Sequence, residues 1–442
     1  MEISEYGVGT RRSNVLSMPA ASSNFDHSST LMVENTQQER LDGYVRPVGG
    51  VTGSGPYNFE IPPFADAYVL MTKVALYVKA KITQVDGTAC VATDLVAPVA
   101  GLGSVMWEHA EVSLNDYSMS GARASNIHYK AYIESLLSYD AQAKETHLRA
   151  QLFMPDTAGQ METFKNSGDN QNKGWTNRYN LTKNSQSFDM MGPITVDFLR
   201  SSKHLAPGNK LNIKLTKAQD RFLLCSKVAN KEYMLSIEDL RLYYYRVRLT
   251  ESIPPPQTER YLTTRTELKR FPVPTGQPSY SLTIFRGAKL PKSVIIGQVL
   301  TSAAEGEYAQ NPFNFQHFDL NRISLRQNGR QIPADDYTPD FENGLYMREY
   351  LSMFMHTGAY GNDRSNFITS KAFKDGSTLF AYDLTPDLCN SAHIHESMPG
   401  ELTLELHWKN QLANPITVIA LCVFDSMIIH HHDENEFSEE LI

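Results

Sequence analysis

The stretch DLNRISLRQNGRQIP, residues 319–333, decides how this chain folds. Ile323 and Leu325 alternate with polar neighbours, which is typical of a strand with one buried face. Asn328-Gly329 follows, and this dipeptide is a strong signal for a two-residue hairpin turn. The stretch therefore predicts a strand, a tight turn and the start of a second strand.

A second stretch has the same build. In AEVSLND, residues 110–116, Val112 and Leu114 alternate with polar residues, and a polar Asn-Asp turn comes next. Other parts of the two halves also match in the same order, namely HYKAYIESLL (128–137) with LYMREYLSMF (345–354), APGNKLNIKL (206–215) with MPGELTLELHW (398–408), and LRLYYYRVRL (240–249) with TVIALCVF (417–424). The offsets are 211 for the Ser-Leu strand, 218 from Tyr132 to Tyr350 and 192 for Pro-Gly. Unequal offsets favour two globular copies of one fold whose loops differ in length.

Strand patterns dominate both halves of the sequence. Apolar residues alternate with polar ones in residues 73–83, 210–217 and 401–409, while residues 417–424 are continuously apolar, as in a strand covered on both faces. Only residues 127–140 and 344–356 have clear helical patterns. With 442 residues, the chain is long enough for two β-rich domains. We therefore predict an all-β protein of two tandem eight-stranded jelly rolls (a double jelly roll) with a few short helices in loops.

The domain boundaries follow from composition. The three prolines of ESIPPPQTER exclude an inner strand and indicate a linker. The Gly- and Asn-rich content of residues 155–192 suits outward loops. We predict an N-terminal arm at 1–45, jelly roll 1 at 46–250, a proline-rich linker at 251–260, jelly roll 2 at 261–432 and an acidic C-terminal tail at 433–442.

Bulk properties narrow the classes of function. The formal charge of −8, with a mildly acidic first segment, argues against strong direct nucleic-acid binding. The first 15 residues have no apolar segment of a signal peptide, and no apolar run is long enough to span a membrane. The four cysteines have no metal or redox spacing, so we expect free, partly buried thiols at Cys90, Cys225, Cys389 and Cys422.

No segment carries a convincing catalytic or metal-binding motif. Phosphate-loop, zinc-protease and serine-hydrolase signatures are absent from the sequence. His430-His431-His432-Asp433 could hold a metal, but a solvated terminus is the simpler interpretation. Three weaker candidates have equally simple explanations: the His393, His395 and Glu396 group as a polar loop, Asp335-Asp336 as a turn between strands, and residues 49–55 as a glycine-rich linker. We therefore assign no catalytic, cofactor-binding or metal-binding residue, and we expect no enzyme.

One further pattern concerns aromatic residues. Residues 241–248, RLYYYRVR, interleave basic and aromatic residues, as surfaces that bind single-stranded nucleic acid do. The same segment aligns with the apolar 417–424 strand of the other copy, and aromatic strands are ordinary in β-sandwiches. We interpret it as a structural strand.

The ordered motifs resemble a known family. GAKLPKSVIIGQV (287–299), NPFNFQHFDLNRISLRQNGRQIP (311–333), LYMREYLSMFMHTG (345–358) and FAYDLTPD (380–387) look like parts of the major capsid proteins of Polinton (Maverick) elements and adintovirus-like viruses. In the first half, residues 78–87, 107–116, 128–140 and 205–224 carry the resemblance, which spans about residues 55–430. The arm and the tail do not match.

The resemblance implies a place in the double-jelly-roll capsid lineage. It implies a homotrimer that forms a pseudo-hexameric capsomer and tiles an icosahedral shell around a DNA genome. The implied partners are neighbouring trimers, a single-jelly-roll penton protein and minor capsid proteins. The implied location is the virion, assembled in the host nucleus or cytoplasm.

Two other functions fit a pair of β-sandwiches. A tandem β-sandwich that binds carbohydrate or another ligand without catalysis is the main alternative. A cupin-like metalloenzyme is the second, and it would need His393, His395 and Glu396 inside a barrel.

Overall fold

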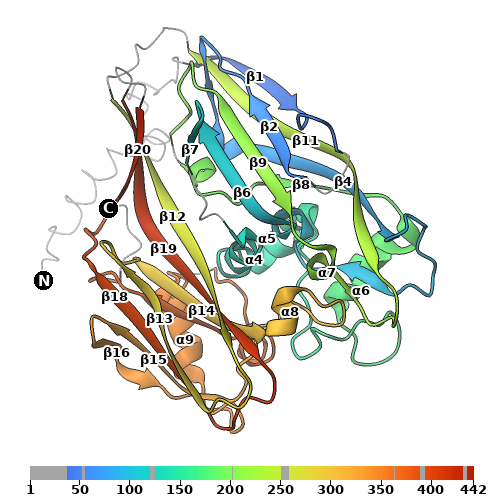
Figure 1. The fold of residues 1–442 in the computed structure, drawn as a ribbon, viewed down its shortest axis with the longest axis vertical. Helices are drawn as coiled ribbons and strands as arrows, with labels where there is room; N and C mark the ends of the chain where they lie inside the picture. The colour runs from blue at the N-terminus through green and yellow to red at the C-terminus, as the bar shows by residue number, and fades with distance from the viewer. Residues whose placement is uncertain are drawn as a thin grey trace, which may run out of the picture.

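The computed structural model describes residues 37–51, 55–119, 125–201, 203–249, 258–362, 364–388, 394–431 and 436–442. Two β-sandwiches lie side by side, and several helices gather where they meet (Figure 1). We call the described residues up to 249 roll 1 and those from 258 onward roll 2. The named strands of each roll pair only with strands of the same roll.

Roll 1 consists of two facing antiparallel sheets and a small accessory pair. Its long sheet has the strand order β1 (Gln37–Val45), β11 (Tyr233–Leu249), β4 (Ala75–Gln84), β8 (Phe188–Pro193), with β3 (Ala67–Val69) also on β11. Its short sheet has the order β2 (Tyr57–Ile61), β9 (Leu211–Lys217), β6 (Trp107–Leu114), β7 (Tyr117–Ser118). The accessory pair is β10 (Leu224–Ser226) with β5 (Val96–Pro98).

Roll 2 repeats this plan strand for strand. Its long sheet has the order β12 (Thr258–Val273), β19 (Ile416–His431), β14 (Ser293–Leu300), β17 (Leu379–Asp383), with β20 (Glu436–Leu441) on β19. Its short sheet has the order β13 (Ser279–Gly287), β18 (Gly400–Trp408), β15 (Leu320–Gln327), β16 (Arg330–Tyr337). In both rolls the chain crosses between the sheets in the same sequence of long and short, which is the winding of a jelly roll. The predicted double jelly roll is confirmed.

The matched segments of the sequence occupy equivalent strands. Residues 110–116 and 321–327 fall on β6 and β15, the third strand of each short sheet. Each continues through a tight two-residue turn whose backbone is left-handed, at Asn115-Asp116 (φ 45° and 73°) and at Asn328-Gly329 (φ 51° and 79°). Such turns match the twist of the flanking strands. The similarity of the two stretches therefore reflects a duplicated fold.

Short helices fill the connections. The α-helices are α3 (Leu102–Val105), α4 (Ile127–Leu137), α5 (Ala141–Glu145), α6 (Lys173–Thr182), α7 (Asp220–Leu223), α8 (Thr301–Glu305), α9 (Met347–His356) and α10 (Ser370–Lys374). The 3-10 turns are η2 (Met71–Lys73), η4 (His147–Gln151), η5 (Lys183–Ser185) and η6 (Phe198–Arg200). Helices α4 and α9 are the two that the sequence predicts, and they occupy the same connection in their rolls, between the last strand of the short sheet and the edge strand of the long sheet.

Burial follows the predicted periodicity. In β4, Leu76, Val78 and Ala80 are buried while the residues between them are not, which leaves one face of the strand toward the core. The same alternation holds in β9 and β18. The first seven residues of β19 are all buried, so this strand is covered on both faces as predicted.

The structure places strands in both segments that were expected at the ends of the chain. Residues 37–45, expected within an arm, form β1 on the edge of a sheet, and residues 436–441 of the expected tail form β20. Both are edge strands that are held by backbone pairing with one neighbour. Their sequences therefore show little alternation of apolar and polar residues. Residues 258–260 belong to β12, whereas residues 1–36 and 251–257 lie outside the described residues. The linker and the domain limits stay predictions.

Two local expectations also fail. Asp335-Asp336 lies within strand β16, where the sequence predicted a turn. The segment 155–192 is only partly an outward loop, because α6 buries Trp175 and Arg178 completely. Strand β16 is defined by its pairing with β15, and α6 is buried by contacts with residues distant in the sequence, such as the one from Trp175 to Cys225.

The cysteines that lie among the described residues agree with the expectation of free, buried thiols. Cys90, Cys225 and Cys422 are free and buried, and Cys389 lies outside the described residues. Burial raises the pKa of the Cys90 thiol, and it raises that of Cys422 to about 12. These thiols are poor nucleophiles and behave as small apolar side chains.

The two hairpin turns predict opposite responses to substitution. Asp116→Gly should stabilise the protein by up to about 1 kcal/mol, because glycine adopts a positive φ without strain. Gly329→Ala should destabilise it by about 1 kcal/mol for the same reason, since a Cβ at Gly329 meets no atom within 4 Å and only the backbone is strained. Equilibrium unfolding in urea measures both. Equal effects of the same sign would contradict the shared turn geometry.

Candidate functional site

Within the described part of the chain, the metal-binding candidates of the sequence are not gathered into a metal centre. His395 Nε2 lies 2.8 Å from Asp387 Oδ1, while His393 lies outside the described residues and the Glu396 side chain is highly exposed. His432 and Asp433 also lie outside them. Among the described residues, no group of three or more His, Cys, Asp or Glu could hold a metal ion.

His430 differs from its expectation. It was interpreted as part of a solvated terminus, but it is buried in β19 and stacks on Phe437 of β20 with ring centroids 4.0 Å apart. Its Nδ1 lies 3.5 Å from a carboxylate oxygen of Glu259 on β12. The correction has a simple cause, because β20 folds back along β19 and covers the ring.

The main concentration of buried chemistry lies where the two rolls meet. Helix α4 of roll 1 is at its centre, and every residue of this helix except Glu134 is buried. The ring of Tyr132 stacks flat on Phe313 of roll 2, with centroids 4.1 Å apart, and Tyr129 meets Phe313 edge-on at 5.6 Å. Aromatic contacts of this kind hold large apolar areas together. Helix α4 is therefore the apolar core of the roll–roll junction.

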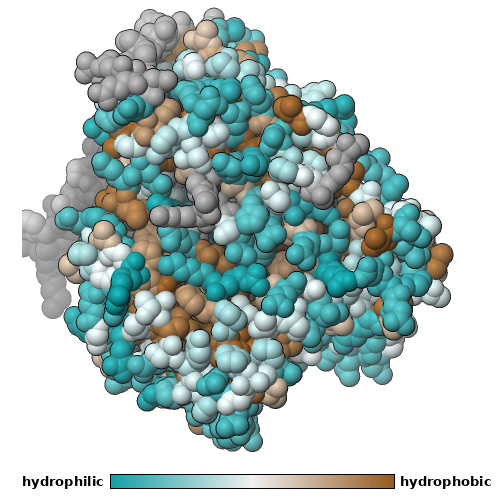
Figure 2. Space-filling view, in the orientation of Figure 1, coloured by the Kyte–Doolittle hydropathy of each residue, from teal (hydrophilic) through white to brown (hydrophobic). Residues whose placement is uncertain are grey.

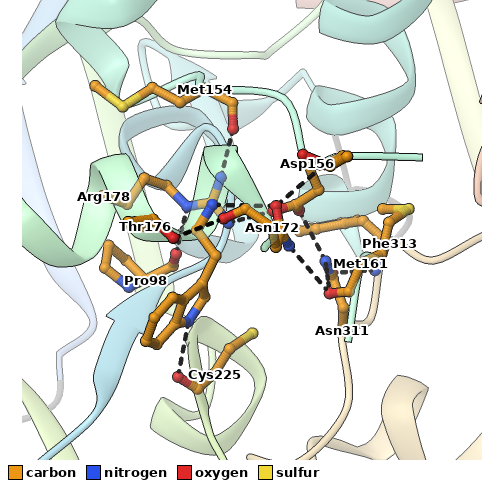
Figure 3. A network of polar contacts seen from close by, with 12 residues as sticks. Pro98, Met154, Asp156, Met161, Asn172, Thr176, Arg178, Cys225, Asn311 and Phe313 are labelled. Atoms are coloured by element: carbon orange, nitrogen blue, oxygen red, sulfur yellow. Dashed lines mark hydrogen bonds and ion pairs between the residues drawn. The ribbon is translucent and has the colours of Figure 1, made fainter. Parts of the chain in front are cut away.

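One polar network crosses this junction at Asp156 (Figure 3). Arg178 of α6 is completely buried, and its Nη2 donates to Asp156 Oδ1 at 2.7 Å. The rest of the guanidinium donates to the backbone carbonyls of Pro98 and Met154. Asn311 of roll 2 donates to Asp156 Oδ2 at 2.8 Å. Each guanidinium nitrogen and both carboxylate oxygens of this buried charge pair thus form a hydrogen bond, and one of these bonds comes from the other roll.

A second network crosses at Asp197. Its carboxylate forms an ion pair with the buried Lys130 of α4 and accepts hydrogen bonds at 3.0 Å from the Thr264 hydroxyl and the Thr266 backbone N–H, both on β12 of roll 2. Burial raises the pKa of Asp197, but Lys130 and these hydrogen bonds outweigh it, so the pKa lies below its usual value. The carboxylate therefore stays charged and holds β12 against roll 1.

A cleft of about 310 Å³ lies beside α4 at the same junction. It is lined by α4 of roll 1 and by β14, β17, β19 and the end of α9 of roll 2. Lys292 and Asp425 form an ion pair in it, and His356 accepts a hydrogen bond from the Asp383 backbone at 3.1 Å. Burial lowers the pKa of His356. The cleft has polar groups that could hold a small ligand, but those named here already pair with each other or with the backbone.

The aromatic and basic segment of β11 divides between two faces. Leu240, Leu242 and Tyr244 are buried toward the core of roll 1. Arg241 and Tyr243 lie on the outward face of the long sheet, where the Arg241 guanidinium sits 5.8 Å from the ring centroids of both Tyr44 and Tyr77. The strand is structural, as expected from its pattern, and its outward side chains also form part of the partly exposed surface.

Exposed apolar side chains are otherwise scattered. On the face seen in Figure 2, hydrophobic residues lie in small groups among hydrophilic ones. Three of the exposed apolar residues share one face of α9, because Met347, Leu351 and Met355 follow each other at intervals of four residues. No helix within the described part of the chain has both the length and the apolar character to cross a membrane.

The architecture is that of double-jelly-roll proteins, and solved structures share it. A chain of the Sputnik virophage cryo-EM structure superposes with a TM-score of 0.62 at 13% identity, covering 94% of this chain and 91% of that one. The mavirus major capsid protein gives a TM-score of 0.51 at 11% identity, covering 95% and 93%. A chain of the PBCV-1 virus capsid gives 0.52 at 8% identity, covering 94% and 99%. These likenesses establish a common fold over nearly the whole chain.

In sequence, the chain is similar to a protein of Caenorhabditis elegans, the uncharacterized protein F54H12.2. The two are 22% identical over 353 residues, which cover 75% of this chain and 80% of that protein. No family model matches the chain.

The Asp156 network predicts a large effect of one substitution. Asp156→Ala should lower the free energy of unfolding by about 3–5 kcal/mol, because it leaves the buried Arg178 guanidinium without its counter-charge. Asp42→Ala removes the exposed pair with Arg40 and should cost less than about 1 kcal/mol. Urea unfolding of both variants measures the difference. Equal costs would contradict a structural role for the buried pair.

His128 of α4 predicts a pH dependence. Its ring is buried 4.3 Å from Phe222, and neither ring nitrogen has a hydrogen-bond partner among the described residues. Burial, with Arg270 and His109 nearby, lowers its pKa to about 3. The unfolded chain therefore takes up this proton first, and stability is lost as the pH falls from about 6.5 toward 3, by about 2 kcal/mol at pH 5.

The test compares the native chain with His128→Leu. The variant should lose less stability between pH 7 and pH 5, because the other titrating groups are unchanged. Unfolding curves at both pH values measure this difference. Identical pH profiles of the two proteins would contradict a neutral, buried His128.

Proposed function

We propose that this chain is the major capsid protein of a virus or virus-like element. The observation that carries the proposal is the repeated sheet order of two jelly rolls, locked side by side by α4 and the Asp156 and Asp197 networks. In a subunit of this kind the two rolls act as two similar wedge-shaped units held at a fixed angle. The fold shared with capsid chains of the virophages and PBCV-1 supports the same role.

The number of rolls in each chain suggests how the chains assemble. Three chains supply 3 × 2 = 6 rolls, so a homotrimer forms a pseudo-hexameric capsomer that packs on a hexagonal lattice. Such capsomers tile an icosahedral shell around a DNA genome. Five-fold vertices have a different symmetry, so they take a separate penton protein of the single-jelly-roll kind, and minor capsid proteins complete the set of partners.

The particular family we propose is that of Polinton (Maverick) and adintovirus-like major capsid proteins. The ordered motifs of the sequence support it. The protein then acts in the virion, after assembly in the host nucleus or cytoplasm, and it has no enzymatic activity. The alternative, a ligand-binding tandem sandwich, would use the cleft beside α4 as a monomer.

The mass of the purified chain tests the proposal. A trimer has a mass of 3 × 49.8 ≈ 149 kDa, and light scattering after size exclusion should give this value. Electron microscopy of the same fraction should show six-sided particles or shells. A stable 49.8 kDa monomer at all concentrations would contradict the capsid role and favour the ligand-binding alternative.

A further inference from the structure

The contact between the rolls of one chain is asymmetric. Roll 1 contributes α4, whose Ile133 and Leu137 line the junction cleft. Roll 2 contributes the outward face of its long sheet, where Ile295 and Leu421 are in register across β14 and β19 and line the same cleft. A helix of one roll thus lies against the sheet of the next, and the two partners present different surfaces.

The sheet that corresponds to this docking face is uncovered in roll 1. Tyr77 on β4 is in register with Arg241 on β11 and with Met191 on β8, as Ile295 is with Leu421 and Ala381 in roll 2. Tyr44 and Tyr243 extend the row onto β1. Tyr44 is 53% exposed and Met191 is 38% exposed, although apolar and aromatic groups of this size usually find cover. The outward face of the long sheet of roll 1 is therefore an open aromatic surface.

The helix of roll 2 that corresponds to α4 also has an exposed apolar face. Helix α9 occupies the same connection in roll 2, but Met347, Leu351 and Met355 on one of its faces are 50%, 45% and 43% exposed. In α4 all residues but one are buried, because roll 2 lies against it. Among the described residues, a partly exposed sheet face and a helix with an exposed apolar face thus correspond to the two halves of a contact that the chain already makes internally.

We propose that the α9 stripe, formed by Met347, Leu351 and Met355, docks on the outward sheet face of roll 1 in a second copy of this chain. The contact repeats the arrangement of α4 on roll 2. It is heterologous, so each chain gives one helix and receives one, and a ring of three chains closes after six rolls. The inference rests on the trimer proposed above and names the surfaces that form it.

The chemistry of the two surfaces is complementary. Methionine side chains are flexible and make favourable contacts with aromatic rings, and the sheet face offers Tyr44, Tyr77 and Tyr243. Arg241 already lies near two of these rings, which holds them in place for an incoming helix. Aromatic and arginine side chains at the centre of an interface commonly carry most of its binding energy.

Two single substitutions test the pairing. Leu351→Lys places a charge on the helix stripe, and Tyr77→Lys places one on the sheet face. Both residues lie on the outside of a single chain, so each variant should fold yet shift from about 149 to about 50 kDa. Met398→Lys makes the same kind of change at a residue that is 64% exposed and belongs to neither surface, and it should stay trimeric. Circular dichroism and thermal unfolding check that each variant is folded, and Leu351→Gln or Tyr77→Gln replaces the corresponding lysine variant if it is not.

A mixture of the two variants gives the sharpest outcome. The Tyr77→Lys chain keeps an intact helix, and the Leu351→Lys chain keeps an intact sheet face, so one contact per pair survives and no ring can close. At high concentration the mixture should contain a species of 2 × 49.8 ≈ 100 kDa that neither variant forms alone.

The outcomes separate this inference from the proposed function. A native chain that is monomeric overturns the trimer, and the inference with it. A native trimer whose Leu351→Lys and Tyr77→Lys variants stay trimeric overturns only the pairing of α9 with the sheet face. A mixture without the two-chain species, at concentrations where the native chain is trimeric, also overturns the pairing.

Discussion

The long sheet of roll 2 is apolar on both faces, and this is the constraint on which the rest of the molecule depends. One face packs on its own short sheet, while the other, with Ile419 and Leu421 of β19, faces roll 1. Full burial of one such side chain contributes about 1.5–3 kcal/mol, so leaving the outward face in water would cost much of the stability of a single domain. Helix α4 and the aromatic contacts around Phe313 are the cover that this sheet requires.

Apolar cover does not by itself fix how the rolls are oriented, because hydrophobic burial has no direction. Two carboxylates at the junction supply that direction. Asp156 and Asp197 both belong to roll 1, and each accepts hydrogen bonds from roll 2, from Asn311 in one network and from Thr264 and Thr266 in the other. A tilt of one roll against the other would break hydrogen bonds to charged groups that are largely shielded from water. A fixed angle between wedges is what a closed ring needs.

Much of this fold is visible in the sequence, because strands and two-residue turns are local. The Ser-Leu strands with their Asn-Asp and Asn-Gly turns, the two helices and the alternation of β4 could all be predicted from short patterns. Strands β1 and β20 could not, since an edge strand is defined by the partner it pairs with. The burial of Arg178 was missed for a related reason: its acceptors are 80, 24 and 22 residues away along the chain. The sequence does show the four-residue spacing of Met347, Leu351 and Met355. That this stripe is a contact surface can be inferred only from the structure, in which the corresponding helix α4 is buried.

The order of these elements along the chain has a consequence for synthesis. Helix α4 ends at Leu137, and β19 begins at Ile416, so the ribosome completes roll 1 long before it makes the strand with two apolar faces. A strand of that kind, emerging without a cover, would be prone to pair with copies of itself. Here the covering helix is already folded and tethered nearby when the strand appears. Because roll 1 precedes roll 2 in the chain, its helix α4 is available to cover that strand as it emerges, and the opposite order of the two rolls would not provide this cover.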